Sequence, residues 1–329
     1  DRAGRIELKD DRGMETLPRI DFTDFRFGDL AERRAVARRI ADACAHYGFF
    51  YLTGHGVPEE AIAHTFEVGE RFFALPLEQR MACRAKARNQ NRGYQPMFDT
   101  KHGDRPDGKE SFDMGFPLPP DDPDVLAGLP FHAVNTWPDD PELRHAMEAL
   151  YFSMLECGRN VLRAMAMALD ADENFFVSRC RKPITNMRIL HYPPQELIKD
   201  RTDIGAGEHT DKGLITLLLN DRRGGLEVKT PAGDWIEAPP MDGAIIINVG
   251  RLLTRWTNGR FVSAVHRVYN RTGLRRYSIP QFHHADYRAV IDPRDLPGVT
   301  DPKFEPVVAG DFVAESFRGD RASWREAAA

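Results

Sequence analysis

The chain has 329 residues, of which 42% are apolar and 29% are charged, and its formal net charge is −5. This composition is typical of a globular protein with one large domain or two modest ones. A protein whose main partner is nucleic acid is usually basic, so the acidic balance argues against that class. No apolar run approaches the ~20 residues that a membrane-spanning helix needs, so we expect no membrane partner.

The four cysteines are widely spaced and form no CxxC pair. A chain of this length does not need a disulfide scaffold, which favours a reducing compartment. The opening stretch "DRAGRIELKDDRG" is too highly charged for a secretory signal peptide. We therefore expect a cytoplasmic location.

Helices and strands alternate in the first part of the chain. Apolar residues at helical spacing predict helices at 29–47, 57–76 and 141–169. Two short runs, 17–22 and 49–56, are predicted to form strands. The methionines of the longest helix lie on its apolar face, which indicates core packing.

Two stretches lack a regular pattern. Residues 1–16 are highly charged, which predicts a disordered tail. Residues 82–140 are polar and rich in Pro, Gly and Asp, which predicts a long loop. Long loops in compact proteins are usually functional or mobile, so we expect this one to form part of a substrate site.

From about residue 184 the pattern changes from helical to strand-like. Short apolar runs such as "NMRILHY", "LITLLLN" and "GAIIINV" are separated by Gly, Pro, Asn and Asp. Many short strands with turns between them are typical of a sandwich or jelly-roll barrel. We therefore predict an α+β fold with a mostly β core. An N-terminal region at 17–140 precedes a catalytic region at 141–329, and the two are expected to form one compact unit, 17–329.

The stretch "GEHTD" places two potential metal ligands one residue apart. Side chains alternate between the faces of a strand, so His209 and Asp211 would point the same way on one strand. His266, in the run "SAVHRVYN", is a candidate third ligand, because a buried histidine needs a hydrogen bond or a metal. Two histidines and one carboxylate form the facial triad of non-haem Fe(II) oxygenases. Zn²⁺ uses similar ligands, so these residues are also compatible with a zinc hydrolase.

A second pair of polar residues lies in "LRRYSIPQF". Arg276 and Ser278 are two residues apart on a predicted strand and face the same side. A guanidinium fork and a hydroxyl together suit a carboxylate. The turn-like "NRTG" at 270–273 connects this strand to the His266 strand and would bring the pair close to the metal. The arrangement indicates a small dicarboxylate that chelates the metal at one end and binds Arg276 and Ser278 at the other.

Motifs along nearly the whole chain resemble the iron- and 2-oxoglutarate-dependent dioxygenases, in the branch that is similar to isopenicillin N synthase. The resemblance implies a double-stranded β-helix (jelly roll) with N-terminal and central helices packed on it. The matching stretches are "LPRIDF", "HYGFFYLTGHGVP", "FFALP", "NRGYQP", "KESFDMG", "RILHYPP", "GEHTD", "GGLEV", "NVGRLLTRWTNGRFVSAVHRV" and "RYSIPQF".

The same resemblance implies cofactors and a reaction. Fe(II) and O₂ are required, 2-oxoglutarate is the cosubstrate, and ascorbate is a candidate stimulant. Decarboxylation of 2-oxoglutarate to succinate and CO₂ would accompany hydroxylation, desaturation or cyclisation of a small-molecule substrate. The oligomeric state stays open and is compatible with a monomer. The residues that the family pattern assigns are His209, Asp211 and His266 for the metal, and Arg276, Ser278 and Tyr192 for 2-oxoglutarate.

The chain departs from the usual family motifs at several positions. Leu190 and His191 stand where relatives often have Asn and Tyr, which removes a polar contact at position 190. Arg251 stands where relatives usually have Asp, so the local ion pairing must differ. Lys212 replaces an aromatic or small apolar residue.

Three residues are candidates for contacts with the substrate: Lys212, Arg188 and Phe112. In a regular strand Lys212 would point away from the metal and into solvent. Gly213 follows it, however, and glycine in a strand often marks a bulge. A bulge would turn the Lys212 ammonium toward the pocket, where it could pair with an acidic or carbonyl group of the substrate.

Other functions remain compatible with the sequence. Besides the zinc hydrolase, they are a non-haem iron oxidase of the same family that uses no 2-oxoglutarate, and a small-molecule sensor on the same fold. Metal analysis, tests for turnover with Fe(II) and Zn(II), and succinate release would discriminate among them.

Overall fold

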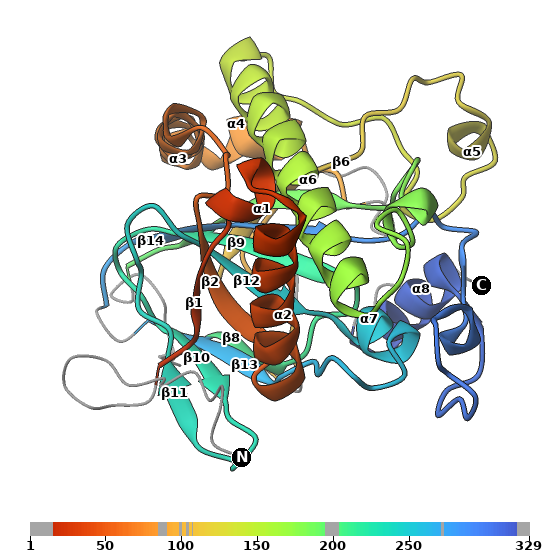
Figure 1. Cartoon of the computed structure of the whole chain (residues 1–329). Coiled ribbons are helices and arrows are strands. Elements are labelled where there is room, and N and C mark those ends of the chain that lie inside the picture. The colour runs from red at the N-terminus through yellow and green to blue at the C-terminus, as the bar shows by residue number, and fades with distance from the viewer. Residues whose placement is uncertain are drawn as a thin grey trace.

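The computed structural model describes residues 16–84, 91–98, 101–102, 105–106, 108–194, 204–270 and 273–320. All but the last residue of the predicted disordered tail therefore lies outside the described residues. Two β-sheets form the centre of the molecule, and long helices pack against the larger sheet (Figure 1). This is the predicted α+β arrangement with a mostly β core.

Strands from both halves of the chain build the larger sheet. The first two strands pair in parallel, and the other described neighbours are antiparallel. Hydrogen bonds thus join strands of 17–140 to strands of 141–329 within one sheet. The predicted division of the chain at residue 140 stays a prediction. In order across the sheet, the strands are β1 (Arg19–Asp21), β2 (Phe49–Thr53), β12 (Ile245–Val249), β9 (Ile215–Asn220), β14 (Arg276–His283), β7 (Asn186–Tyr192), β6 (Glu110–Gly115) and β3 (Gly93–Gln95).

The smaller sheet faces one side of the larger one. A hydrophobic cluster joins the two, with Tyr51, Leu190 and Ile246 from the larger sheet and Leu226 and Val268 from the smaller. This is the double-stranded β-helix that the motifs predicted. The strands of the smaller sheet, in order, are β11 (Trp235–Glu237), β10 (Leu226–Lys229), β13 (His266–Tyr269) and β8 (Ile204–His209).

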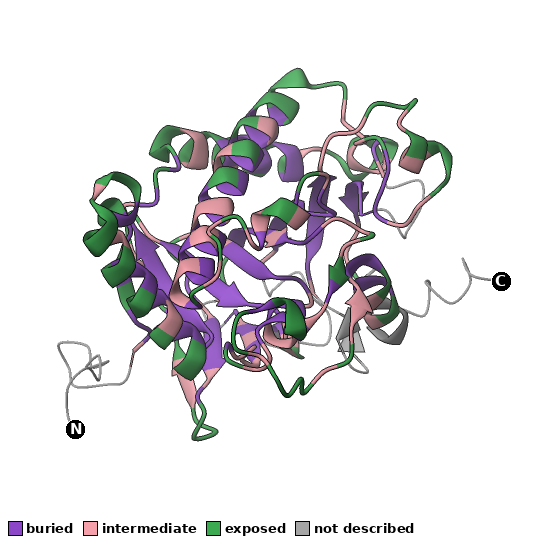
Figure 2. Cartoon of the chain, turned by 45° about the vertical axis from the view of Figure 1, so that its right-hand side comes forward, coloured by how far each residue is buried: buried purple, intermediate pink, exposed green. Residues whose placement is uncertain are grey.

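Three long helices bury one face each and leave the other face to solvent (Figure 2). They are α2 (Leu30–His46), α3 (Glu59–Ala74) and α6 (Pro141–Ala168), close to the predicted ranges. Asp29 and Glu32 form a capping box at the start of α2, which satisfies free backbone N–H groups. Gly48 follows α2 with φ +65°, a conformation that glycine adopts without steric cost.

Shorter elements complete the fold. No helix in the described part of the chain is long and apolar enough to cross a membrane. The remaining elements are α1 (Thr23–Phe27), α4 (Leu77–Ala82), β4 (Lys101–His102), β5 (Arg105–Pro106), α5 (Pro123–Leu126), β15 (Val290–Ile291), β16 (Val307–Val308), α8 (Ala309–Asp320) and α7 (Arg251–Trp256), with short 3₁₀ turns at Val177–Arg179 and Pro293–Asp295.

The prediction of one long loop at 82–140 is wrong in part, because strands β3 and β6 lie within it. All six residues of β6 are buried, although half of them are polar. The polar side chains have partners in the interior. Glu110 binds Arg80, Tyr94 and His191, and Asp113 forms an ion pair with Arg188. The buried strand β6 therefore could not be recognised from its hydrophobic pattern.

Candidate metal centre and ligand cavity

A cavity lies between the two sheets. Its volume is about 160 Å³. Alternate residues of β7 and β14 face it, as the two-residue period of a strand requires. The residues that line it are Phe49, Lys109, Asn186, Arg188, Leu190, Tyr192, Ala206, His209, Thr210, Asp211, Lys212, Thr216, Leu218, Leu226, Asn248, His266, Val268, Arg276, Ser278, Pro280, Phe282 and His284.

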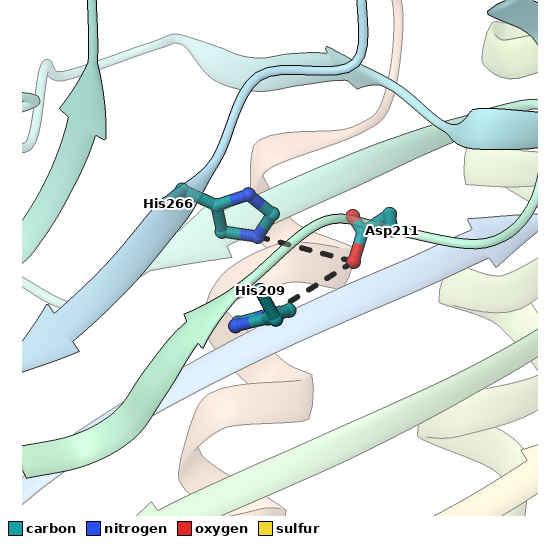
Figure 3. A group of neighbouring side chains, drawn as sticks. All are labelled: His209, Asp211 and His266. Atoms are coloured by element: carbon teal, nitrogen blue, oxygen red, sulfur yellow. Dashed lines mark ion pairs between the residues drawn. The ribbon is translucent and has the colours of Figure 1, made fainter. Parts of the chain in front are cut away.

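The three predicted metal ligands line this cavity, and their side chains lie close together (Figure 3). His209 ends β8 and lies opposite His266, the first residue of β13. An oxygen of Asp211 is 4.0 Å from Nε2 of His209 and 3.8 Å from Nε2 of His266. The candidate ligand atoms all lie within 4.8 Å of one another.

The expectation that His209 and Asp211 share one strand is wrong. β8 ends at His209, and Asp211 follows in a turn before β9 begins. A residue of α7 holds this turn in place, since the backbone N–H of Arg251 donates to the Asp211 carbonyl at 2.8 Å. The turn, and not strand alternation, therefore brings the carboxylate between the imidazoles.

Backbone hydrogen bonds fix the tautomers of His209 and His266. Nδ1 of His209 donates to the Gly207 carbonyl at 2.7 Å, and Nδ1 of His266 donates to the Ala264 carbonyl at 3.2 Å. A neutral imidazole that donates from Nδ1 keeps the lone pair on Nε2, which faces Asp211 in both residues. This donor set suits a transition metal with imidazole and carboxylate ligands.

The second oxygen of Asp211 is occupied within the protein. Oδ2 accepts hydrogen bonds from Thr216 Oγ1 at 2.5 Å and from Asn248 Nδ2 at 2.7 Å. Burial alone would raise the pKa of Asp211. The neighbouring imidazoles and the two hydrogen bonds outweigh burial and hold that pKa below its ordinary value. Asp211 is therefore an ionised carboxylate with Oδ1 directed at the two histidines.

Arg276 is only 1% exposed and lines the cavity. Its guanidinium donates to the Gly224 carbonyl at 2.7 Å, to Asn220 at 2.9 Å and to Ser278 Oγ at 3.2 Å, and it lies 4.8 Å from the Tyr192 ring centroid. Among the described residues, no carboxylate forms an ion pair with Arg276. A buried cation needs an anionic partner, so the site fits a carboxylate ligand.

The connection between β13 and β14 differs from a simple hairpin. The two strands belong to opposite sheets, and both contribute residues to the cavity. Residues 271–272 of the predicted "NRTG" turn lie outside the described residues. The predicted proximity of the Arg276–Ser278 pair to the metal ligands thus arises because the sheets face each other.

The three predicted substrate residues have different positions. Arg188 and Lys212 line the cavity, and Arg188 also pairs with Asp113 at 3.0 Å. Phe112 does not line it. Its ring is fully buried in the hydrophobic core, 5.0 Å from the Phe72 ring and 5.7 Å from Trp137. Phe112 faces away because β6 alternates, and the structure gives it a packing role.

The departures from the family motifs are accommodated locally. Leu190 lines the cavity, whereas His191 points to the other face of the sheet and bonds Glu110 at 2.7 Å. Arg251 donates to Ser316 of α8 at 2.9 Å, and its guanidinium lies over the Phe312 ring. Arg251 thereby connects the start of α7 to the C-terminal helix.

Sequence reasoning missed the residues that support the ligands. Thr216, Asn220 and Asn248 hold Asp211 or Arg276, and none of them was predicted. Each is a polar residue in an otherwise apolar strand, "LITLLLN" or "AIIINV". A buried polar residue needs a partner. A polar residue within an apolar strand was therefore the sequence feature that could have identified these supporting residues.

Two family models match the chain. The model described as "non-haem dioxygenase in morphine synthesis N-terminal" matches residues 17–140. The "2OG-Fe(II) oxygenase superfamily" model matches residues 183–285, which include the triad and the Arg276–Ser278 pair.

Curated proteins are similar over almost the whole length. The chain is 34% identical over 311 residues to a 2-oxoglutarate-Fe(II) type oxidoreductase of Emericella nidulans, with 92% of this chain and 89% of that protein covered. It is 32% identical over 289 residues to a homoarginine-6-hydroxylase of Oryza sativa subsp. japonica, with 85% and 88% covered.

Solved structures share the fold. A Neurospora crassa protein in complex with alpha-KG (2-oxoglutarate) and thymine has a TM-score of 0.80 and 30% identity, covering 92% of this chain and 96% of that one. A putative 2OG-Fe(II) oxygenase family protein from Caulobacter crescentus has a TM-score of 0.80 and 32% identity, covering 92% and 99%. With the double-stranded β-helix already described, these matches show that the chain belongs to the 2OG-Fe(II) oxygenase superfamily and is an oxidoreductase that requires Fe(II), 2-oxoglutarate and O₂.

Proposed function

We propose that this dioxygenase oxidises a small ring compound in the cavity between its sheets, with Fe(II) on His209, Asp211 and His266. The observation that carries the proposal is the convergence of three ligand atoms within 4.8 Å beside a buried arginine. Arg276 and Ser278 bind the distal carboxylate of 2-oxoglutarate, and the Tyr192 ring lies against the Arg276 guanidinium. Family membership favours this reading over a zinc hydrolase or a sensor.

When bound, Fe(II) with 2-oxoglutarate and O₂ supplies the oxidation of an unactivated C–H bond, with release of succinate and CO₂. The protein residues bind and orient the reactants. Asp211 contributes one negative charge, and the histidines bind as neutral imidazoles, so acid weakens metal binding by protonating them. Arg276 balances one charge of the dicarboxylate in a site screened from water by the apolar lining, which includes Phe49 and Leu218.

The substrate is proposed from the shape and polarity of the cavity. Phe282 lines the cavity and offers an aromatic surface to a small ring, and the Neurospora crassa protein with 30% identity binds thymine and 5-formyluracil in crystals. Among the described side chains, Asn186 Nδ2, Arg188 Nε and His284 Nδ1 have no hydrogen-bond partner. All three residues line the cavity, and substrate oxygens would satisfy such groups.

A cytoplasmic location is part of the proposal. It is supported by the four cysteines, all of which are free and buried. Free thiols persist in reducing compartments.

The experiment measures 2-oxoglutarate binding by calorimetry, under nitrogen, with Fe(II) present. Arg276→Leu is expected to lose ~2–5 kcal/mol of binding free energy, because it removes one member of a buried charge pair. Ser278→Ala removes one hydrogen bond to a charged group and should lose less, ~1.5–3 kcal/mol. Asp211→Ala is expected to abolish Fe(II) binding and turnover.

The matched control is Arg179→Leu, which removes a half-buried arginine that pairs with Asp295 and does not line the cavity. It should leave the affinity for 2-oxoglutarate unchanged. Native affinity in Arg276→Leu, or native Fe(II) binding in Asp211→Ala, would refute the assignment of these residues.

A further inference from the structure

The turn that carries Asp211 packs against the first turn of α7. The N–H of Arg251, the first residue of α7, donates to the Asp211 carbonyl at 2.8 Å, and the next two N–H groups of the helix donate to the carbonyls of residues 212 and 213 at 3.1–3.4 Å. A Cβ on Gly250 would come within 2.3 Å of the Gly213 carbonyl oxygen, so the glycine permits this close approach. The first N–H groups of a helix have no partner within it. The turn satisfies them, and α7 in return fixes the backbone of Asp211.

The side chain of Arg251 contacts a different element, the C-terminal helix α8, which lies beside α7 (Figure 1). One guanidinium nitrogen donates to Ser316 Oγ at 2.9 Å, and the guanidinium lies 5.7 Å from the Phe312 ring centroid. Ser316 Oγ itself donates to the Phe312 carbonyl at 2.8 Å, so its own helix holds the hydroxyl in place. A hydrogen bond from a charged donor is stronger than one between neutral groups. Arg251 therefore joins the turn of Asp211, through its backbone, to α8, through its side chain.

The helix α8 is itself fixed to the rest of the protein. The N–H of Gly310 donates to the Tyr287 carbonyl at 2.8 Å, and a Cβ on Gly310 would come within 2.2 Å of the Tyr287 ring. The buried face of α8 contributes to a separate hydrophobic cluster, which comprises Phe131, Ile184, Val313 and Ala314. A side-chain contact restrains a turn only if its far end is held. These contacts hold α8 against the segments that precede β7 and follow β14.

We propose that Arg251 is a positioning residue of the metal centre, because it fixes the backbone of Asp211 relative to α8. Thr216 and Asn248 hold the Asp211 side chain, whereas Arg251 holds its main chain. Arg251 does not line the cavity, so it acts only through Asp211. The inference rests on the proposed function, since it concerns the same Fe(II) ligands. Without the contact to α8, the turn gains freedom to move, and a ligand that is less well oriented binds the metal more weakly.

The test measures the dissociation constant of Fe(II) by anaerobic titration of the full chain. Arg251→Met keeps an aliphatic stem and removes the guanidinium. It is expected to bind Fe(II) about tenfold more weakly, the lower end of the range for groups that support a metal ligand. Arg251→Lys can still donate to Ser316 and should retain most of the parent affinity. Such a rescue is not expected if the side chain only fills space.

Ser316→Ala removes the other partner of the contact and leaves Arg251 in place. It should also weaken Fe(II) binding. The double variant Arg251→Met/Ser316→Ala should bind Fe(II) no more weakly than Arg251→Met alone, because the two substitutions remove the same contact. Ser153→Ala is the matched control. Ser153 likewise bonds the carbonyl four residues earlier in its helix, at 3.0 Å, but it lies in α6 and should leave Fe(II) affinity unchanged.

Arg255 provides a second control, which separates this contact from the general packing of α7 against α8. It lies one turn further along α7, is half-buried like Arg251, and has its guanidinium 5.5 Å from the same Phe312 ring centroid. Its hydrogen-bond acceptor is the Glu305 carbonyl, at 2.8 Å. Arg255→Met should lower the free energy of unfolding, measured in urea without metal, and leave the Fe(II) affinity unchanged.

Native Fe(II) affinity in Arg251→Met or in Ser316→Ala would overturn the proposal, and so would an equal loss in Arg255→Met or additive losses in the double variant. If Arg251→Met does not fold, Ser316→Ala decides the question, because it removes a single hydroxyl. Asp211→Ala is titrated alongside. Failure of the parent to bind Fe(II), or native binding by Asp211→Ala, would refute the proposed metal ligands, whereas the ratio between Arg251→Met and the parent tests the contact with α8 alone.

Discussion

The two oxygens of the Asp211 carboxylate have different neighbours. Oδ1 faces the histidines, while Oδ2 is held by Thr216 and Asn248. Thr216 and Asn248 are paired across β9 and β12, so neighbouring strands set the carboxylate orientation together. Loss of a group that orients a metal ligand in this way typically lowers metal affinity or activity about 10–100-fold.

Removing these supports should weaken the metal centre without removing a ligand. Asn248→Leu and Thr216→Val are each expected to lower Fe(II) affinity about 10–100-fold, because the carboxylate loses its fixed orientation. Anaerobic Fe(II) titration measures the dissociation constant. Thr65→Val is the control, since Thr65 is a buried threonine of α3 that bonds the Ala61 carbonyl. Unchanged Fe(II) affinity in Asn248→Leu and Thr216→Val would contradict this role.

At the residue scale, the sequence singled out the three candidate metal ligands but not the residues that support them. His209, Asp211 and His266 lie in recognisable motifs, and the structure brings them together. The partners of Asp211 depend on the register between β9 and β12, which a single sequence does not specify. Phe112 lies in a matched motif, but its burial in the core could not be read from that motif.

At the scale of elements, hydrophobic periodicity located the long helices and the apolar strands and failed for β6. Glu110 in this strand accepts from Tyr94 and pairs with Arg80 and His191. The partners come from α4, β3 and β7, so the strand is stabilised by contacts that are distant in sequence. Local pattern cannot reveal an interior strand whose polar groups are satisfied by other elements.

Glu110 should therefore be important for stability. Glu110→Ala leaves Arg80, Tyr94 and His191 without their common acceptor, and breaking a buried ion pair on one side costs about 3–5 kcal/mol. Urea unfolding measures the loss. Glu67→Ala is the matched control, because Glu67 forms an ion pair with Arg71 on the exposed face of α3. If the two variants lose similar amounts of stability, the network around Glu110 does not hold β6 in place.

At the scale of the whole molecule, β14 links the sheet to the helices and the cavity. Arg276 and Ser278 face the cavity from one end of this strand, and His283 packs at the other end against Gly158 of α6. A Cβ on Gly158 would come within 2.1 Å of the His283 ring, so the glycine permits this close approach. Burial, with smaller effects of His284 and Arg159, lowers the pKa of His283 to about 3.

This buried histidine predicts a loss of stability in acid. Between the unfolded pKa of about 6.5 and the folded pKa of about 3, the unfolded chain binds a proton that the folded protein excludes. Stability is therefore fully present above pH 6.5 and falls as the pH drops toward 3. From pH 7 to pH 5 this single group accounts for about 2 kcal/mol.

His283→Gln removes the titrating group and keeps a polar side chain of similar size. The decrease in unfolding free energy from pH 7 to pH 5 should be about 2 kcal/mol smaller than in the parent, because glutamine binds no proton in either state. Urea unfolding of metal-free protein at the two pH values measures this difference, which cancels any uniform loss caused by the substitution. His145→Gln removes an exposed imidazole of α6 and is the control. An equal pH dependence in the parent and His283→Gln would show that His283 is protonated, or accessible to protons, in the folded protein.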